Sequence, residues 1–224
     1  MTPEQLAAQL RHPQGEEGNK VADNMDDRNS PVILAAYQAL APADGDRILE
    51  IGPGSAGHLP GLLAQASNLH YTGLDASRDM VLRARERYLG ETRAAFIHGE
   101  LTQAPLAPAS MDRIVAVNVV YFWQPLPLAL NVLNLLLRPG GTLVLGLRDH
   151  NSMANLPVFK HGFSTYHGPE LQQALEQAGF TDTTLDTFAE DSVDVLGDTM
   201  HKRSVILTAV SYTHLRAHET DYYL

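Results

Sequence analysis

Cysteine is absent from the 224 residues, and its absence excludes three kinds of chemistry. The chain can form no disulfide, use no thiolate nucleophile and offer no thiolate ligand to a metal ion. Basic residues are also few, because 16 lysines and arginines stand against 26 acidic residues and give a formal net charge of −10. Nucleic-acid binding depends on cations facing phosphates, so we expect no nucleic-acid partner.

Long hydrophobic segments are missing as well. No apolar run reaches the roughly 18 to 20 residues that a membrane-spanning helix requires. The first residues, MTPEQLAAQLRHPQ, lack the apolar centre of a secretory signal peptide. We therefore expect a cytoplasmic protein with no membrane partner. The ten histidines are scattered and form no His-Glu-x-x-His motif, so we predict no metal site.

Length and composition fit one domain, because 224 residues with 44% hydrophobic content can bury a substantial core. We expect N-terminal helices within 1–45, a core over 46–210 and a tail at 211–224. Strands are expected near 48–51, 69–74, 94–98, 113–118, 142–148, 181–188 and 202–210, and helices near 3–10, 31–40, 58–66, 77–89, 125–137 and 169–178. This alternation predicts an α/β fold with a doubly wound, mostly parallel sheet that ends in an antiparallel hairpin.

The stretch from Asp46 to Gly57, DRILEIGPGSAG, joins an apolar strand to a glycine-rich turn. Gly52, Gly54 and Gly57 allow the backbone to approach a ligand where a Cβ atom would collide. The helix expected after them would direct its free N–H groups at the same ligand. The pattern predicts a pocket for an adenosine-containing cofactor. Taken alone, the loop is equally compatible with a chance glycine turn.

Two cofactor classes compete for this loop. Residues 52–57 satisfy the G-x-G-x-x-G fingerprint of dinucleotide-binding proteins, in which a pyrophosphate sits on the helix N-terminus. Glu50 lies two residues before the first glycine, where a carboxylate would repel a pyrophosphate and accept hydrogen bonds from an ammonium group. Asp75 ends the second strand, about 20 residues past the glycines, and is placed to accept from both ribose hydroxyls in either class.

Three further motifs follow in order along the chain. One strand ends at Glu100, the next ends at Asn118, and residues 136–145, LLRPGGTLVL, combine a helix end, a Pro-Gly-Gly turn and a fifth strand. Together with the first loop and Asp75, these motifs resemble class I S-adenosylmethionine-dependent methyltransferases of the methyltransferase type 11-like family. One position departs from the family pattern, because Ala56 stands where a third glycine is usual and Gly57 follows it.

The resemblance implies a seven-stranded sheet, S-adenosylmethionine as cofactor and in-line methyl transfer to a small-molecule acceptor. It implies that Glu100 accepts from the adenine amino group and that the backbone of Asn118 borders the sulfonium. The residues that it places around the cofactor are Glu50, Gly52, Gly54, Gly57, Asp75, Ala76, Met80, Glu100, Leu101 and Asn118. Two other functions stay open: an NAD-dependent oxidoreductase, which would not need Glu50, and a non-catalytic binding protein with the same fold.

Methyl transfer from a sulfonium asks little of a protein, because the leaving group already carries the positive charge. A general base is needed only when the acceptor must lose a proton. The candidates follow the fourth and fifth strands, where open α/β sheets bind ligands. They are Tyr121, in the run Tyr121-Phe122-Trp123, and His150, which follows Asp149. The aromatic run could instead belong to the core, and His150 could be a plain surface residue.

Two segments are candidates for controlling access to the site. Residues 21–29, VADNMDDRN, either cover the cofactor or form a solvated linker. Residues 151–168 form a connection long enough for a lid. Its aromatic residues Phe159, Phe163 and Tyr166 offer an apolar wall for a hydrophobic acceptor, or anchor the loop.

The C-terminal segment 211–224, SYTHLRAHETDYYL, has neither strand nor helix periodicity. It holds three of the eight tyrosines, directly after the expected last strand. Its first ten residues resemble the translation of a sequencing adapter. We therefore expect a non-native tail, with a genuine polar tail as the alternative.

Overall fold

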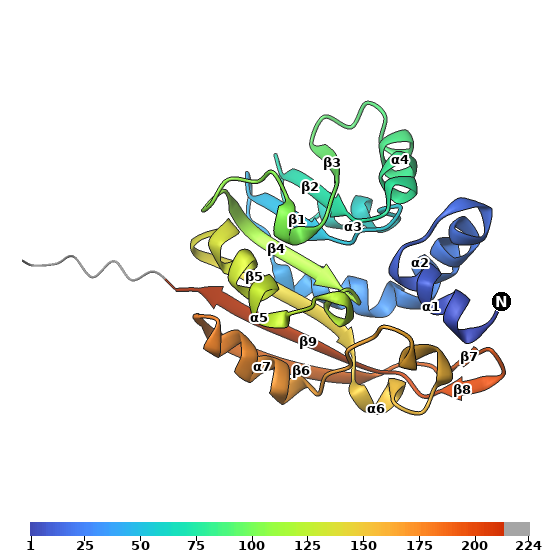
Figure 1. Ribbon diagram of the computed structural model, residues 1–224. Coiled ribbons are helices and arrows are strands. Elements are labelled where there is room, and N and C mark those ends of the chain that lie inside the picture. The colour runs from blue at the N-terminus through green and yellow to red at the C-terminus, as the bar shows by residue number, and fades with distance from the viewer. Residues whose placement is uncertain (213–224) are drawn as a thin grey trace, which may run out of the picture.

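The computed structural model describes residues 1–212, which form a seven-stranded sheet with helices on both sides (Figure 1). The strand order is β3-β2-β1-β4-β5-β9-β6. The bounds are β1 Arg47–Ile51, β2 His70–Asp75, β3 Ala94–His98, β4 Met111–Val117, β5 Leu137–Arg148, β6 Phe180–Ala189 and β9 Arg203–Ser211. β9 is antiparallel to β5 and β6, and the pairs from β5 through β3 are parallel. The predicted sheet and its C-terminal antiparallel hairpin are confirmed.

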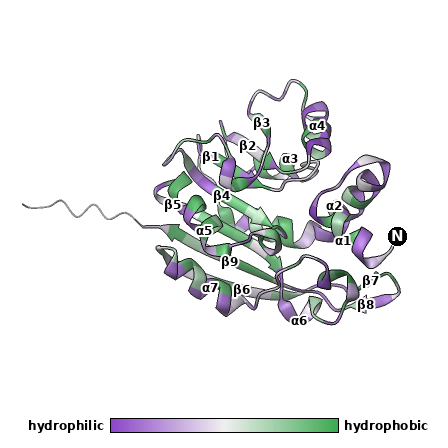
Figure 2. Cartoon of the chain, viewed as in Figure 1, coloured by the Kyte–Doolittle hydropathy of each residue, from purple (hydrophilic) through white to green (hydrophobic). Residues whose placement is uncertain are grey.

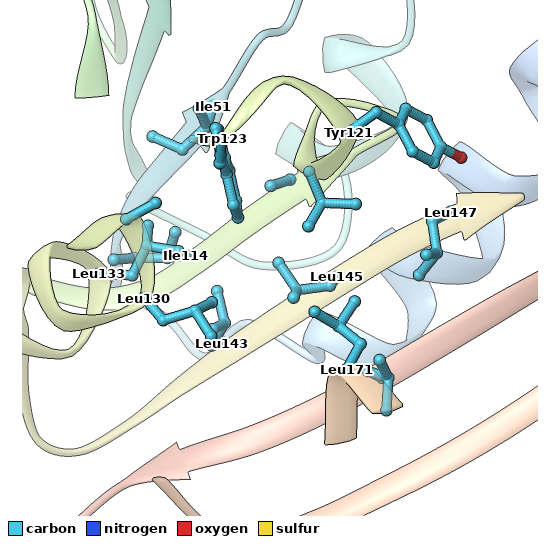
Figure 3. Close-up of a cluster of buried hydrophobic side chains, with 14 of the residues drawn as sticks. Ile51, Ile114, Tyr121, Trp123, Leu130, Leu133, Leu143, Leu145, Leu147 and Leu171 are labelled. Atoms are coloured by element: carbon cyan, nitrogen blue, oxygen red, sulfur yellow. The ribbon is translucent and has the colours of Figure 1, made fainter. Parts of the chain in front are cut away.

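Successive side chains of a strand point to opposite faces, so the central strands contribute to two cores. On β5, Leu143 and Leu145 enter one buried cluster and Val144 enters the other. Helices α5 (Leu126–Leu136) and α7 (Gly168–Gln177) cover the first face, shown in Figure 3. Helices α3 (Leu59–Leu63), α4 (Arg78–Arg87) and the second half of α2 (Gly15–Leu40) cover the other face. Figure 2 shows that the sheet is largely hydrophobic, whereas α4 and α7 carry hydrophilic residues.

The N-terminal region is more helical than its sequence predicts. After α1 (Pro3–Arg11), one long helix, α2 (Gly15–Leu40), includes Pro31 in its interior. Its buried residues fall at helical spacing in two groups, one at Gly18, Val21 and Ala22 and one from Val32 to Leu40, and the half-buried Met25 and Asn29 continue the same face between them. The sequence predicted no helix between residues 10 and 31, but α2 begins at Gly15, so residues 21–29 are helical and the solvated linker is wrong.

Short elements gather at the end of the sheet to which β4 and β5 point (Figure 1). The connection after β5 contains α6 (His150–Met153) and a 3₁₀ turn at Pro157–Lys160 that contacts α1. A small hairpin, β7 (Val193–Val195) and β8 (Asp198–Met200), was not predicted. Its turn residues Leu196 and Gly197 both have positive φ, as two-residue hairpins favour.

Ser211 belongs to the folded domain, although the sequence assigns it to the tail. It ends β9 opposite Phe180, is buried, and donates from its hydroxyl to Oδ1 of Asn134 at 2.6 Å. The tail predicted at 211–224 otherwise lies outside the described residues, except for Tyr212. None of the helices formed by residues 1–212 combines the length and apolar character needed to span a bilayer.

Candidate active site

Close backbone contacts shape the loop after β1. The N–H of Gly52 donates to the carbonyl of Leu74 in the neighbouring strand at 2.8 Å. The φ of Gly52 is +69°, and a Cβ atom there would lie 2.3 Å from Cγ1 of Val119. Both the conformation and the available space therefore require glycine. Two residues later, the N–H of Gly54 donates to Oδ2 of Asp75 at 2.9 Å.

Asp75 ties this loop to the end of β2. Its Oδ1 atom accepts from the N–H of Ser77 at 2.8 Å, while Oδ2 accepts from Gly54. Burial raises the pKa of Asp75, and the two N–H donors offset only part of that effect. A carboxylate has about four lone-pair sites, so Asp75 can accept further hydrogen bonds from ligand hydroxyls.

Glu50 is buried on β1, and its carboxylate accepts from two tyrosine hydroxyls. Tyr71 on β2 donates to Oε2 at 2.7 Å, and Tyr37 on α2 lies 2.9 Å from Oε2 and 3.0 Å from Oε1. Burial raises the pKa of Glu50 to about 7, although both hydroxyls act to lower it. No sequence motif marks these tyrosines, because they reach Glu50 from other elements.

Ala56 occupies the position where the family pattern has glycine. Its φ of 55° lies in the left-handed region, where a residue with a Cβ atom is strained by roughly 1 to 2 kcal/mol. Gly57 is constrained differently, because a Cβ atom there would lie 2.5 Å from Oδ2 of Asp26 on α2. The hydroxyl of Ser55 donates to the same oxygen at 2.8 Å. Helix α2 thus closes directly over the loop.

A first cavity opens at the carboxyl ends of β1, β2 and β4, where the strand order reverses between β1 and β4. Open α/β sheets bind ligands at this switch point. All ten residues assigned to the cofactor line it, namely Glu50, Gly52, Gly54, Gly57, Asp75, Ala76, Met80, Glu100, Leu101 and Asn118. The opposite wall comes from α1, α2 and the residues between them: Leu10, Arg11, His12, Pro13, Met25, Asp26, Asn29, Ile33 and Tyr37. Three of these residues lie within 21–29, the segment for which covering the cofactor was one of the two predicted alternatives.

A second cavity lies beside the first, and the two have a common wall formed by Leu10, Met25, Asn29, Asn118 and Phe122. The side chains around the second cavity are mainly aliphatic and aromatic. Phe163 packs against Tyr121, Phe122 and Phe159, with ring centroids 5.7, 4.7 and 5.1 Å away. Phe159 and Phe163 therefore form an apolar wall, whereas Tyr166 packs on the core.

Among the described residues that line the second cavity, the charged ones are Arg28, Arg148 and Lys202. Arg148 and Lys202 are buried, and both pair with the buried carboxylate of Glu190. Burial raises the pKa of Glu190, but hydrogen bonds from Ser204 and Lys202 and the charge of Arg148 outweigh it, so the pKa is lowered. Sequence patterns did not reveal this cluster, whose members come from β5, β9 and the segments that flank β7 and β8.

Tyr121 lines the second cavity with its hydroxyl already engaged. The hydroxyl donates to Oδ1 of Asn118 at 2.9 Å and accepts from the backbone N–H of Arg148 at 2.5 Å. Burial raises the pKa of Tyr121 well above its ordinary value, which disfavours the phenolate that a general base requires. In Figure 3 its ring lies at one end of the apolar cluster and its hydroxyl points away from the labelled leucines.

His150 lines neither cavity, so its position does not support the predicted role as general base. Its Nδ1 atom lies 2.7 Å from Oγ1 of Thr165, and its ring lies 4.6 Å from that of His167. Asp149, the partner that the sequence suggested for His150, is instead 3.5 Å from Nδ1 of His167. The chain turns into α6 at His150, and the ring packs against the 165–167 segment.

The fold and the first cavity define an α/β protein with a cavity at the switch point of a mostly parallel sheet. Residues 49–145 match the family model of a methyltransferase domain. A probable S-adenosylmethionine-dependent methyltransferase of Mycolicibacterium smegmatis is 31% identical over 176 residues, which cover 76% of this chain and 66% of that protein. A demethylmenaquinone methyltransferase of Clavibacter sepedonicus is 30% identical over 137 residues, which cover 59% and 52%. The match thus spans about half the length of that relative.

Solved structures support the same assignment of the fold. A chain in the complex between the Haloferax volcanii Trm112 methyltransferase activator and a methyltransferase superposes with a TM-score of 0.77. It is 20% identical, and the match covers 86% of this chain and 93% of that one. The chain described here belongs to the class I S-adenosylmethionine-dependent methyltransferases.

Proposed function

We propose that the chain binds S-adenosylmethionine in the first cavity and transfers the methyl group to a small molecule in the second by in-line displacement. The wall shared by the two cavities carries this proposal. It would hold the sulfonium and the acceptor next to each other and away from bulk water. Positioning and the exclusion of water are the two contributions that this reaction needs. Asn118, at the end of β4, belongs to that wall and would border the sulfonium.

In this proposal different residues of the first cavity contact different parts of the cofactor. Glu50 accepts from the ammonium group, Asp75 accepts from the ribose hydroxyls and Glu100 accepts from the adenine amino group. Met80 and Leu101 supply apolar surface for the adenine ring. The glycine loop between them allows the backbone to approach the cofactor closely.

Calorimetry and a product assay test the proposal together. We expect S-adenosylhomocysteine to bind and NAD not to bind, because the carboxylate of Glu50 would repel a pyrophosphate. Incubation with methyl-labelled S-adenosylmethionine and a pool of small molecules should yield a labelled product. Tight binding of NAD alone would support the oxidoreductase instead. Cofactor binding without any transfer to a broad acceptor pool would support a non-catalytic binding protein.

A further inference from the structure

The charge around the second cavity is opposite in sign to the net charge of the whole chain. The formal net charge is −10, yet the described charged residues that line this cavity are all cations. Arg148, Lys202 and Glu190 form a buried cluster, in which the single negative charge of Glu190 neutralises one of the two cations. One positive charge therefore remains beside an apolar cavity, where a single anionic group on a ligand would balance it.

Both cations keep donors for such a ligand. Among residues 1–212, Nζ of Lys202 donates to the carbonyl of Arg28 at 3.0 Å and forms an ion pair with Oε2 of Glu190 at 2.9 Å. An ammonium group has three N–H donors, so one is left. In Arg148 both Nη atoms donate to protein oxygens, and its Nε–H has no partner among the same residues.

The cationic cluster adjoins the wall that separates the two cavities. Nη2 of Arg148 lies 3.3 Å from Oδ1 of Asn29, and the backbone N–H of Arg148 donates to Tyr121, which in turn donates to Asn118. Asn29 and Asn118 both belong to the shared wall. An anion paired with Arg148 would therefore lie next to the place where the methyl group is expected to emerge.

Among residues 1–212, the shared wall contains no side chain that could act as a general base. The five residues of the shared wall are leucine, methionine, phenylalanine and two asparagines, none of which titrates. The hydroxyl of Tyr121 is engaged, and His150 lines neither cavity. An acceptor that must lose a proton during the reaction, such as an alcohol, would have no partner to take it. A carboxylate is already ionised at neutral pH.

We propose that the acceptor is a small carboxylic acid with an apolar body, and that its carboxylate oxygen receives the methyl group. This inference rests on the proposed methyl transfer. The apolar body lies against Phe159 and Phe163, and the carboxylate pairs with Arg148 and Lys202. One carboxylate oxygen forms a bond to the methyl carbon while the carbon–sulfur bond breaks, and the bonding electron pair remains on sulfur. The products are a methyl ester and S-adenosylhomocysteine, and no proton moves.

Octanoate, octanamide and 1-octanol make a matched set of probes for the full-length protein. Binding of each is measured by calorimetry in the presence of saturating S-adenosylhomocysteine. We expect octanoate to bind about ten- to a hundredfold more tightly than either uncharged analogue, the range for a charge-assisted hydrogen bond. With methyl-labelled S-adenosylmethionine, octanoate should give labelled methyl octanoate, and 1-octanol should give no methyl ether.

A charge-removing variant tests the cluster itself. Lys202→Met keeps the apolar stem and leaves Arg148 as the partner of Glu190, so we expect at least tenfold weaker octanoate binding with unchanged affinity for S-adenosylhomocysteine. Lys160→Met, at an exposed position that lines neither cavity, is the matched control and should bind octanoate normally. If Lys202→Met does not fold, the comparison of the three probes on the unaltered protein still tests whether the cavity prefers a carboxylate.

The outcomes separate this inference from the proposed function. Equal affinity for octanoate and octanamide overturns the role of the cations. Octanoate that binds without being methylated overturns the carboxylate as acceptor. Binding of S-adenosylhomocysteine with methylation of an alcohol or amine in the wider pool overturns the acceptor class and leaves methyl transfer intact. Failure to bind S-adenosylhomocysteine overturns the proposed function as well.

Discussion

The hydroxyl of Tyr71 lies 2.7 Å from Oε2 of Glu50, inside the core and at the edge of the first cavity. This contact lowers the pKa of Glu50, while burial raises it to about 7. The carboxylate therefore changes charge near neutral pH. In our proposal it faces the ammonium group of the cofactor, so its protonation state affects binding.

We predict that the affinity for S-adenosylhomocysteine decreases as the pH falls from 8 to 6, because protonated Glu50 loses its attraction for the ammonium group. Tyr71→Phe removes one donor to the carboxylate, raises the pKa of Glu50 further and shifts this decrease to higher pH by about one unit. Calorimetry over this pH range measures the effect. Tyr88→Phe, which removes a hydroxyl that donates to the carbonyl of Ala56, is the control and should follow the wild-type curve.

The carboxyl group of Glu50 also makes the free energy of unfolding depend on pH. This dependence has the opposite sign to that of cofactor binding. The pKa of Glu50, about 7 in the folded protein, lies above the ordinary value of 4.5, so the folded state holds the proton more tightly. The stabilisation from this proton is complete below pH 4.5 and is lost as the pH rises through 7. We expect the free energy of unfolding of wild type, relative to that of Glu50→Gln, to fall by on the order of 2 to 3 kcal/mol between these limits. Urea unfolding at each pH tests this, and parallel curves would contradict it.

Asp75→Ala should weaken S-adenosylhomocysteine binding about ten- to a hundredfold, because it removes an acceptor for the ribose hydroxyls. It also leaves the N–H groups of Gly54 and Ser77 without their partner, so we expect a loss of about 1 to 3 kcal/mol in the free energy of unfolding. Asp186→Ala, at an exposed position on β6, controls for the loss of a charge. Calorimetry and urea unfolding separate the two effects, and normal affinity in Asp75→Ala would remove Asp75 from the ribose site.

Gly52→Ala should destabilise the fold by about 2 to 5 kcal/mol, through left-handed strain and overlap with Val119. The double variant Gly52→Ala, Val119→Ala relieves the overlap alone and should recover part of the loss. Denaturant unfolding of both proteins measures the difference. If the double variant is no more stable than the single one, the overlap with Val119 is not the cause.

His150→Ala should leave the turnover number within about twofold of wild type, because the side chain lines neither cavity. Tyr121→Phe removes the hydrogen bonds to Asn118 and Arg148, and we expect slower turnover with an unchanged pH profile, as for a positioning residue. Steady-state kinetics from pH 6 to 9 distinguishes the two roles. Loss of a kinetic pKa in His150→Ala would restore it as the general base.

The strand and helix periods predicted the sheet, and the ends of its strands predicted one side of the first cavity. Glu50 is the penultimate residue of β1, Asp75 ends β2 and Asn118 follows β4, and the carboxyl ends of parallel strands meet at one edge. Their proximity therefore follows from local patterns. A motif does not capture every conformation, because Ala56 adopts the left-handed conformation at a position where the family pattern has glycine.

The parts that the sequence did not reveal depend on contacts between distant elements. Tyr37 reaches Glu50 from α2, and no spacing in the chain records that contact. The polar composition of residues 15–30 hid the helical spacing of Val21 and Ala22, so only the second half of α2 was predicted as a helix, and residues 21–29 kept a solvated linker as an alternative to a cover of the cofactor. The positively charged cluster is equally non-local, since Arg148, Glu190 and Lys202 meet only when β9 inserts between β5 and β6.

Met25 and Asn29 lie one turn apart on α2, and each belongs to both cavities. A ligand in either cavity therefore restricts the same stretch of helix, and the second ligand binds to a wall that is already ordered. Such coupling is reciprocal, so in our proposal the cofactor and the acceptor would raise each other's affinity by the same factor. The first half of α2 would thereby couple the two sites, and this coupling would favour the ternary complex over the complex with either ligand alone.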